Sequence, residues 1–480
     1  MRKARMTALV VGAGVLAAAA IAAATAAFPA ASAASTALPR AQGRPWLVIK
    51  PGIIRLGMTR QDGPSTTAEC EQAYDIACYQ PGQIRAAYGL PALYAKGVTG
   101  KGVTIAIVDS YGSPTIRSDL AAFDKTLGYP APPSFRIVTP AGAIPAYDPD
   151  NTDMVGWASE TTLDVEYAHA LAPGANILLV ETPVSETEGV TGFPQIVTAE
   201  EWVINHGLAD VISQSFGATE ETFTSYAQLS PLRAAYLEAY SRGVTVLAAS
   251  GDSGATDFEL NQTTYYTRPV TSWPDSDPLV TAVGGTQLKL SRGKYTSVAW
   301  NDTYDKAWNE YWDFDPGPSP FASGGGKSEF FARPSYQNGA QSVVGARRGV
   351  PDISMSAACD GSVSIYATFA GQPSGAGWSL ICGTSEATPE FAAVVALADQ
   401  VAGHSLGLIN PTLYALSAAH APGIVPVTSG NNTVSFQQGP ADQLYTVRGY
   451  PARADYSMAT GVGTIYAPDF VDELAGVSVP

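Results

Sequence analysis

The sequence feature that most constrains the fold is an alternation of short apolar runs with helix-like stretches from residue 103 onward. Strands that alternate with helices favour a parallel sheet covered by helices on both faces. We therefore expect an α/β fold with a mostly parallel central sheet. The expected strands are residues 103–108, 176–180, 210–213, 244–248 and 279–283, and helices are expected within 163–170, 197–205 and 231–240.

Ser385 lies between an apolar stretch, residues 378–382, and an alanine-rich run, residues 390–400. This order predicts a strand, a tight turn and a helix, with the Ser385 hydroxyl at the helix N-terminus. Backbone N–H groups there can stabilise an oxyanion. Pro389 is expected in the first helical turn, where its missing N–H costs least. Taken alone, a serine at such a turn is usually only a helix cap, so a nucleophile needs a base.

The chain has four histidines, and none stands in a context typical of a catalytic base. A carboxyl pair is the alternative. Ser159 is a good N-cap for a helix that runs to about Ala170, and Glu160 and Asp164 are four residues apart on it. Their side chains therefore share one helix face. One carboxylate can accept the serine proton while the other orients it, at a pH low enough for partial protonation.

Asp252 provides a third acidic group. It lies in residues 250–254, Ser-Gly-Asp-Ser-Gly, after an apolar run at 243–248 that is typical of a buried strand. An aspartate at the C-terminal end of a parallel strand points into the crevice where such sheets bind ligands.

Taken together, Glu160 with Asp164, Asp252, and Ser385 in Gly-Thr-Ser-x-x-x-Pro resemble the active-site set of the sedolisins, the serine-carboxyl peptidases. The resemblance covers the chain from about Tyr79 to the C-terminus, and it implies a subtilisin-like fold. Further motifs similar to that family follow in order at residues 102–108, 213–217, 283–286, 323–326 and 349–352.

The resemblance also implies a role for each residue. Ser385 would be the nucleophile that forms an acyl-enzyme, Glu160 the general base and later the general acid, and Asp164 its partner. Asp252 stands where subtilisins place an oxyanion-binding asparagine, and it can donate a hydrogen bond only when protonated. The substrate-binding edge, which would pair with an extended peptide, is Ser215, Phe216 and Gly217.

We therefore expect a secreted serine-type endopeptidase that acts on protein and peptide substrates in acid, as a monomer. The pH dependence should be bell-shaped and centred at roughly pH 3 to 5, because ordinary carboxyl pKa values lie near 4. Two alternatives stay open. One is an inactive binding protein on the same fold, and the other is a tripeptidyl exopeptidase of the same family.

The ends of the chain predict its organisation. Residues 1–33 have a basic start, a long apolar run and Ala-Ser-Ala, which is typical of a secretory signal peptide, with an uncleaved anchor as the alternative. Residues 34–78 would be a short pro-region, and residues 79–480 the peptidase domain. No later stretch of eighteen apolar residues predicts a membrane span. The net charge of −16 argues against a nucleic-acid partner.

Four cysteines in an exported protein favour two disulfides. Three pairings are possible. We prefer Cys70–Cys78, which closes a small loop, and Cys359–Cys382, which flanks a hairpin-like stretch and would fasten the turn before Ser385 to a neighbouring strand.

Three further polar residues near these motifs are expected to be structural. Asp109 ends an expected strand at a place similar to the triad aspartate of subtilisins, but the histidine that it would orient is absent. Glu166 points away from the face shared by the carboxyl pair. His169 has no neighbouring ligand in the sequence, so a zinc site is not expected there.

We expect no cofactor. The family usually binds calcium near the C-terminus, but Pro426 and Ser457 stand where two aspartate ligands would lie, and calcium prefers carboxylate oxygens. Calcium remains an alternative if Asp455 substitutes after a shift in register.

Overall fold

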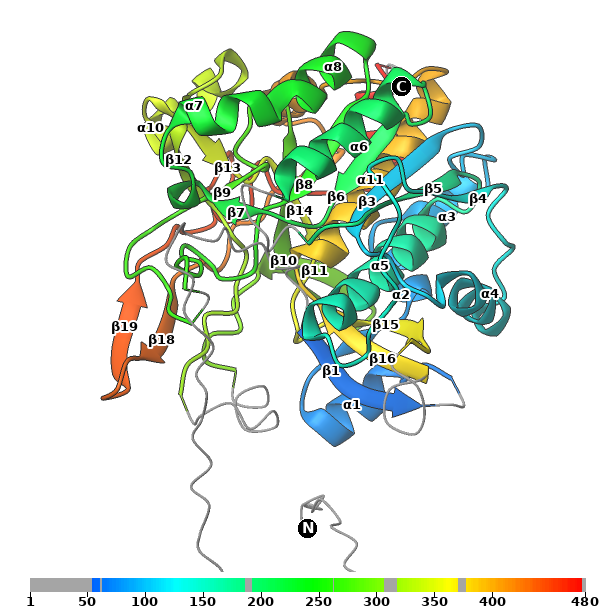
Figure 1. The fold of residues 1–480 in the computed structure, drawn as a ribbon, viewed down its shortest axis with the longest axis horizontal. Coiled ribbons are helices and arrows are strands. Elements are labelled where there is room, and N and C mark those ends of the chain that lie inside the picture. The colour runs from blue at the N-terminus through cyan, green and yellow to red at the C-terminus, as the bar shows by residue number, and fades with distance from the viewer. Residues whose placement is uncertain are drawn as a thin grey trace, which may run out of the picture. The chain divides into compact units, whose positions relative to one another are not determined.

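The computed structural model describes residues 54–60, 63–185, 192–261, 263–305, 317–369 and 377–476 (Figure 1). The signal peptide expected at residues 1–33 lies outside these ranges. So do residues 34–53, which are the first part of the expected pro-region.

A central sheet of eight strands confirms the predicted α/β fold. Its order is β11-β10-β8-β6-β3-β5-β4, and β14 also pairs with β10. Every pair is parallel except β10 with β11. The bounds are β3 Thr104–Ser110, β4 Phe135–Val138, β5 Asn176–Thr182, β6 Val211–Gln214, β8 Thr245–Ala249, β10 Thr281–Ser291, β11 Lys294–Ala299 and β14 Ile353–Ser356.

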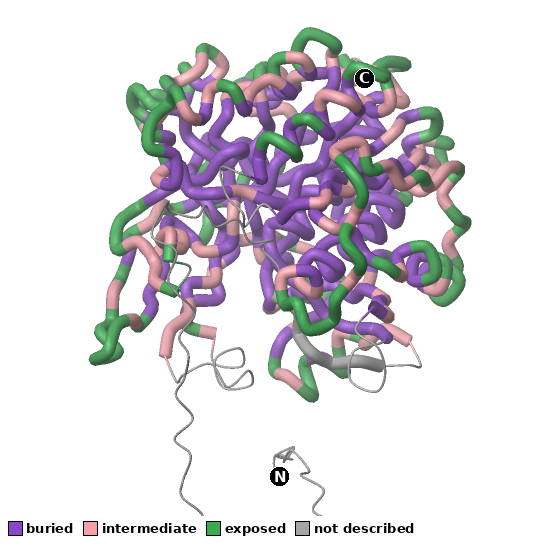
Figure 2. Tube along the Cα trace, viewed as in Figure 1, coloured by how far each residue is buried: buried purple, intermediate pink, exposed green. Residues whose placement is uncertain are grey.

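Alternate side chains of the central strands enter two different apolar cores. In β3, Ile105 and Ile107 join the core that contains most of the buried apolar residues of helices α5 (Thr152–Leu171) and α11 (Thr384–Ala402). Ala106 and Val108 join the core under α6 (Phe193–Asn205) and α8 (Ala234–Arg242). The period of two is that of a strand buried on both faces. Figure 2 shows the buried residues gathered around this sheet.

The strand before Ser385 belongs to a second sheet, with order β1-β16-β15-β2. Strands β15 (Ser362–Ala367) and β16 (Gly377–Cys382) pair antiparallel, as the hairpin-like stretch predicted. Strand β1 (Ile54–Arg60) pairs with β16 in the register Ile54 to Cys382. Part of the expected pro-region is thus a strand of the sheet that ends at the turn before Ser385.

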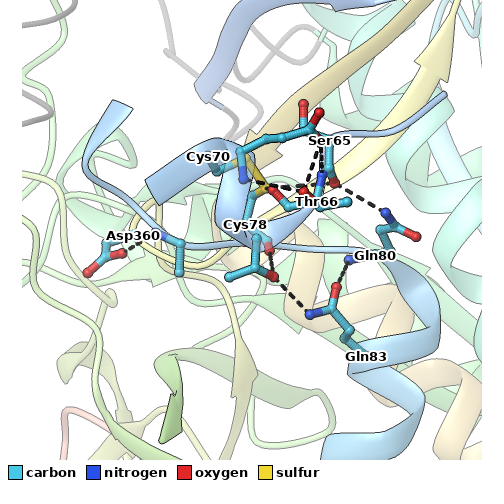
Figure 3. Close-up of a disulfide and its surroundings, with 10 residues drawn as sticks. Ser65, Thr66, Cys70, Cys78, Gln80, Gln83 and Asp360 are labelled. Carbon is cyan, nitrogen blue, oxygen red and sulfur yellow. Dashed lines mark hydrogen bonds between the residues drawn. A yellow bond between two sulfur atoms is a disulfide. The ribbon is translucent and has the colours of Figure 1, made fainter. Parts of the chain in front are cut away.

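Both preferred disulfides are present. Cys70–Cys78 joins helix α1 (Thr67–Tyr74) to strand β2 (Cys78–Tyr79), and Cys359–Cys382 joins the segment before β15 to the end of β16. Figure 3 shows the first of them. The Thr67 hydroxyl donates to the Cys78 carbonyl at 2.7 Å, and the Ala77 N–H donates to Asp360 at 2.8 Å. The first bond lies within this segment, and the second fixes the segment to the loop before β15.

The predicted start of α5 is wrong. Asn151, not Ser159, caps the helix, and its side chain accepts hydrogen bonds from the N–H groups of Asp153 and Met154 at 3.0 and 3.3 Å. Ser159 lies inside the helix and donates its hydroxyl to the Val155 carbonyl at 3.1 Å. A serine hydroxyl can accept a backbone N–H at a helix N-cap, or it can donate to a carbonyl four residues earlier inside a helix. The presence of Ser159 therefore did not decide where the helix begins.

None of the helices within the described ranges combines the length and the apolar character that crossing a membrane requires.

The structure contains further helices and short strands outside the two sheets described above. The remaining bounds are α2 Pro81–Ala87, α3 Leu90–Tyr94, α4 Ile116–Leu127, β7 Ala218–Thr219, η2 Glu220–Thr222, α7 Tyr226–Leu229, η3 Ser230–Arg233, β9 Ser272–Trp273, β12 Gly326–Ala332, η4 Ser335–Ala340, α10 Gln341–Val344, β13 Arg347–Val350, α12 Asn410–Ala418, β17 Ile424–Val425, β18 Val434–Gln438, β19 Gln443–Val447, β20 Thr464–Ile465 and α13 Ala467–Leu474.

Candidate active site

Ser385 is the second residue of α11, so its hydroxyl lies at a helix N-terminus as predicted. The turn before it depends on Gly383, whose φ of 133° is one that residues with a side chain rarely adopt. The Gly383 N–H donates to the Ala357 carbonyl at 2.8 Å and fixes the turn. Ser385 itself is fully buried.

Pro389 lies in the second turn of α11, not in the first. Because proline has no N–H, it cannot donate to the carbonyl of Ser385, four residues earlier. The Ser215 hydroxyl faces that carbonyl instead, at 3.5 Å. The proline therefore leaves the backbone carbonyl of Ser385 without its helical donor.

Glu160 and Asp164 lie on α5, which packs against α11, and both are fully buried. The Ser215 hydroxyl donates to Asp164 at 3.1 Å. The Ser385 hydroxyl faces the Glu160 carboxyl and favours its charged form, although the two do not meet the geometry of a full hydrogen bond. Such contacts often tighten only when substrate binds.

Burial raises the pKa of both carboxyls well above the ordinary range. After desolvation, the largest cause is the charge of Asp109 for the pKa of Glu160, and the charge of Glu160 for the pKa of Asp164. Two acids in this position resist ionising together and titrate as a pair. The pair can therefore hold one shared proton over a range of pH.

Asp109 is the group that the sequence analysis left outside the site. It ends β3 in a fully buried position, and burial raises the pKa of its carboxyl to about 7. The structure brings it within electrostatic range of Glu160 and Asp164. Its place at the carboxyl end of an expected strand, where parallel sheets bind ligands, was the signal that the sequence offered.

Asp252 follows β8 and is held by the first residue of α11. One of its oxygens accepts the Thr384 N–H at 2.7 Å and the Thr384 hydroxyl at 2.8 Å. Its other oxygen, Oδ2, has no hydrogen-bond partner among the described residues. Burial raises the pKa of Asp252 to about 8. A proton on Oδ2 is thus retained well above the ordinary range, and it is free to be donated.

The Asp252 loop rests on Gly324. The Gly324 N–H donates to the Gly251 carbonyl at 2.7 Å, and a Cβ at position 324 would lie 1.8 Å from the Ser250 carbonyl oxygen. Only glycine fits this close approach of two backbones.

Gly324→Ala should therefore destabilise the protein by about 3 kcal/mol, because the Ser250 carbonyl must move, and it should displace Asp252 and reduce activity. The matched control is Gly339→Ala, where a Cβ meets nothing within 4 Å, and it should change the free energy of unfolding by less than about 0.5 kcal/mol. Urea unfolding and kcat/KM of both variants check this. Equal effects of the two substitutions would contradict the close approach at Gly324.

Ser215, Phe216 and Gly217 follow the carboxyl end of β6. The Phe216 ring is buried against Trp157 and Phe193. Among the described residues, the N–H groups of Phe216 and Gly217 donate to no backbone carbonyl. An extended peptide could pair with these N–H groups. The substrate-binding edge at residues 215–217 stays a prediction.

His169 and Glu166, expected to be structural, each contact a neighbouring segment. His169 Nε2 lies 2.9 Å from the Pro130 carbonyl, and Glu166 accepts the Tyr366 N–H at 3.0 Å. Neither group is among the main causes that shift the pKa of Glu160, Asp164 or Asp252.

The residues at the expected calcium position do not fit calcium. Ser457 directs its hydroxyl to its own turn, where it lies 2.9 Å from the Thr460 hydroxyl and accepts the Thr460 N–H at 3.1 Å. Pro426 offers no side-chain oxygen. The local backbone is therefore held by neutral hydrogen bonds at the place where calcium would need carboxylates.

A chelator should leave both the activity and the melting temperature nearly unchanged, because these hydrogen bonds hold the turn without a cation. The measurement is a thermal melt and a rate assay with EDTA and with added calcium. A melting temperature that falls by more than about 5 °C with EDTA and recovers with calcium would show that Asp455 or another residue supplies the ligands.

The chain matches the model of the subtilase family over residues 139–440. It is 33% identical to kumamolisin of Bacillus sp. (strain MN-32) over 387 residues, which are 78% of this chain and 62% of kumamolisin. It is 28% identical to sedolisin of Pseudomonas sp. (strain 101), over 78% of this chain and 58% of sedolisin. It is also 28% identical to tripeptidyl-peptidase 1 of Homo sapiens, over 66% of this chain and 51% of that protein.

A solved structure of Pseudomonas sedolisin, a serine-carboxyl proteinase in complex with pseudo-iodotyrostatin, matches with a TM-score of 0.64 and 25% identity. The match covers 84% of this chain and 99% of that one. In contrast, the chain spans only about half to three fifths of the length of the curated relatives. The family match, these relatives and the fold agree with one another, and this chain belongs to the subtilase family and, within it, to the sedolisins.

Proposed function

We propose that this chain is a serine-carboxyl endopeptidase that hydrolyses peptide bonds in acid through an acyl-enzyme on Ser385. One observation carries the proposal: Ser385, the Glu160–Asp164 pair and Asp252 come from three separate segments and meet at the N-terminus of one buried helix. Kumamolisin and sedolisin, which this chain resembles along most of its length, support the same reaction class.

In the first half of the reaction, Ser385 Oγ attacks the carbonyl carbon of the scissile bond and transfers its proton to Glu160. Asp164 shares the charge of the pair and is oriented by Ser215. The carbonyl oxygen becomes an oxyanion, which accepts a hydrogen bond from protonated Asp252. When the C–N bond breaks, Glu160 returns its proton to the leaving amine and the acyl group remains on Ser385.

In the second half, water attacks the acyl-enzyme with Glu160 again accepting the proton. The same carboxyl then protonates Ser385 as the acid product leaves. No histidine takes part in these proton transfers. The proton stays with Glu160 and Asp164, whose pKa values are raised by burial.

Activity requires one ionised carboxyl in the Glu160–Asp164 pair and a protonated Asp252. The acid side of the pH profile is therefore set by the first ionisation of the pair. The alkaline side is set by Asp252, whose pKa of about 8 extends the upper limit beyond the range expected from ordinary carboxyls. We propose a profile with activity in acid that reaches towards neutral pH.

The test is digestion of a denatured protein at several pH values, with the products mapped by mass. An endopeptidase releases internal peptides of varied length from the start, whereas a tripeptidyl exopeptidase releases only successive tripeptides from the N-terminus. The Ser385→Ala variant is the control for contaminating proteases. If the parent chain releases no peptides at any pH, the proposal is wrong, and the alternative of an inactive binding protein is supported.

We further propose that the protein is secreted and acts as a monomer. Residues 1–33, typical of a signal peptide, and the two disulfides support export. Expression of the whole chain with N-terminal sequencing and sedimentation of the culture-medium protein tests both points. A protein retained in the cells, or one that sediments as a dimer, would refute the corresponding part.

A further inference from the structure

The first half of helix α11 carries two carboxyls that the proposed mechanism does not use, Glu386 and Glu390. They are four residues apart, so they lie on one face of the helix, and Glu386 follows the nucleophile directly. Both are fully buried. Isolated acidic residues are rarely found in such a position without a partner.

No positive charge compensates this second pair. None of the ion pairs among the described residues includes Glu386 or Glu390, and none of their four carboxyl oxygens has a hydrogen-bond partner there. A buried carboxylate without a partner is costly, whereas the neutral acid is tolerated far better.

The groups that face this pair are neutral or acidic. Glu386 lies near Asp252 and near the Ser356 hydroxyl of β14, which favours its charged form without reaching hydrogen-bond geometry. Both glutamates also face two phenols. Tyr88, at the end of α2, accepts the Ser356 N–H at 2.7 Å, and Tyr167 of α5 donates to the Ser364 carbonyl at 3.1 Å.

Burial raises the pKa values of Glu386 and Glu390 well above the ordinary value of a glutamate. The charge of Glu386 raises the pKa of Glu390 further. The sign follows from proton linkage. A carboxyl whose pKa is higher in the folded than in the unfolded state contributes its full stability below the unfolded value, near 4.3, and loses it as the pH rises towards the folded value.

We propose that Glu386 and Glu390 form a pH-dependent lock on the nucleophile helix, closed when both are protonated in acid and opened when they ionise as the pH approaches neutrality. The lock acts on packing, because α11 contacts α5, β6, β8, β10 and β14. Opening it displaces Ser385 from Glu160 and Asp252 and so ends catalysis. This loss is separate from the titration of Asp252, which changes the rate of a site that remains folded.

The experiment uses the full chain with Ser385→Ala, so that self-digestion and the proposed activity play no part. Unfolding in urea is followed by tryptophan fluorescence between about pH 4 and pH 7. Both carboxyls should be protonated in the folded state and ionised in the unfolded state, so that unfolding releases two protons. A plot of the logarithm of the unfolding constant against pH should therefore be steeper by about two than the same plot for Glu386→Gln/Glu390→Gln. The matched control, Glu71→Gln/Glu201→Gln, removes two carboxyls from helix surfaces and should leave the slope unchanged.

Glutamine has donors that this apolar site cannot satisfy, so Glu386→Leu/Glu390→Leu is the second variant. In the chain with Ser385 intact, this variant should lose activity at about pH 7 at least roughly tenfold more slowly than the parent, with kcat/KM at about pH 4 within about threefold of it. A slope equal to the parent's in either double variant that folds, or equal inactivation half-lives, would overturn the lock.

Discussion

Replacing Ser385 by alanine should lower kcat/KM by roughly 10⁴- to 10⁶-fold, and Glu160→Gln should lower it by at least roughly 10⁴-fold. The two residues act as a unit, because the hydroxyl is a poor nucleophile until Glu160 takes its proton. The double variant should therefore be no less active than Ser385→Ala alone. Initial rates on a peptide substrate at the pH optimum measure all three.

The matched control for the glutamate is Glu166→Gln on the same helix. Glu166 is equally buried, but it faces Tyr366 and not the site, so this variant should keep kcat/KM within about threefold of the parent. If Glu160→Gln retained more than about a tenth of the activity, Glu160 would not be the base. Losses that multiply in the double variant would show that the two residues act separately.

Asp252→Asn should lower kcat/KM in acid by up to roughly 10²-fold, since the amide keeps a donor but not the acidic proton. In the parent, Asp252 must stay protonated, and its pKa of about 8 means that kcat/KM falls about tenfold per pH unit above that value. The asparagine does not ionise, so this alkaline decline should disappear in the variant.

The rates are measured directly after a pH jump, and each sample is returned to about pH 4 to show that the helix lock has not opened irreversibly. Asp252→Ala, which removes the donor altogether, serves as the comparison and should lose roughly 10²- to 10³-fold at every pH. An alkaline decline that is the same in the parent and in Asp252→Asn would contradict the oxyanion role.

The sequence predicted the central sheet because its strands are buried on both faces and read as continuous apolar runs. The order of strands along the chain could then be given without knowing which strands are neighbours. The start of α5 could not be predicted in this way. Asn151 and Ser159 are both good caps, and the two helical turns between them, which bury Met154, Trp157 and Ala158, decide in favour of Asn151.

The catalytic set was predicted from local motifs, whereas its surroundings depend on contacts distant in sequence. Asp109 and Glu160 lie on different elements, and nothing in either segment indicates that their charges interact. Similarly, the alanine-rich character of residues 390–400 indicated a helix, but not that Glu386 and Glu390 would be buried in it. The pairing of β1 with β16 joins residues more than three hundred positions apart, and no local pattern predicts it.

The central claim is that Ser385 is a nucleophile activated by a carboxyl group, and trapping of the acyl-enzyme tests it most directly. The chain is mixed with an excess of an activated peptide ester at the pH optimum, quenched in strong acid within milliseconds, and mapped by mass. We predict one acyl group on the peptide that contains Ser385, formed in a rapid burst by the parent and at least roughly 10²-fold more slowly by Glu160→Gln. An acyl group on another residue, or equal bursts in the parent and in Glu160→Gln, would contradict the account.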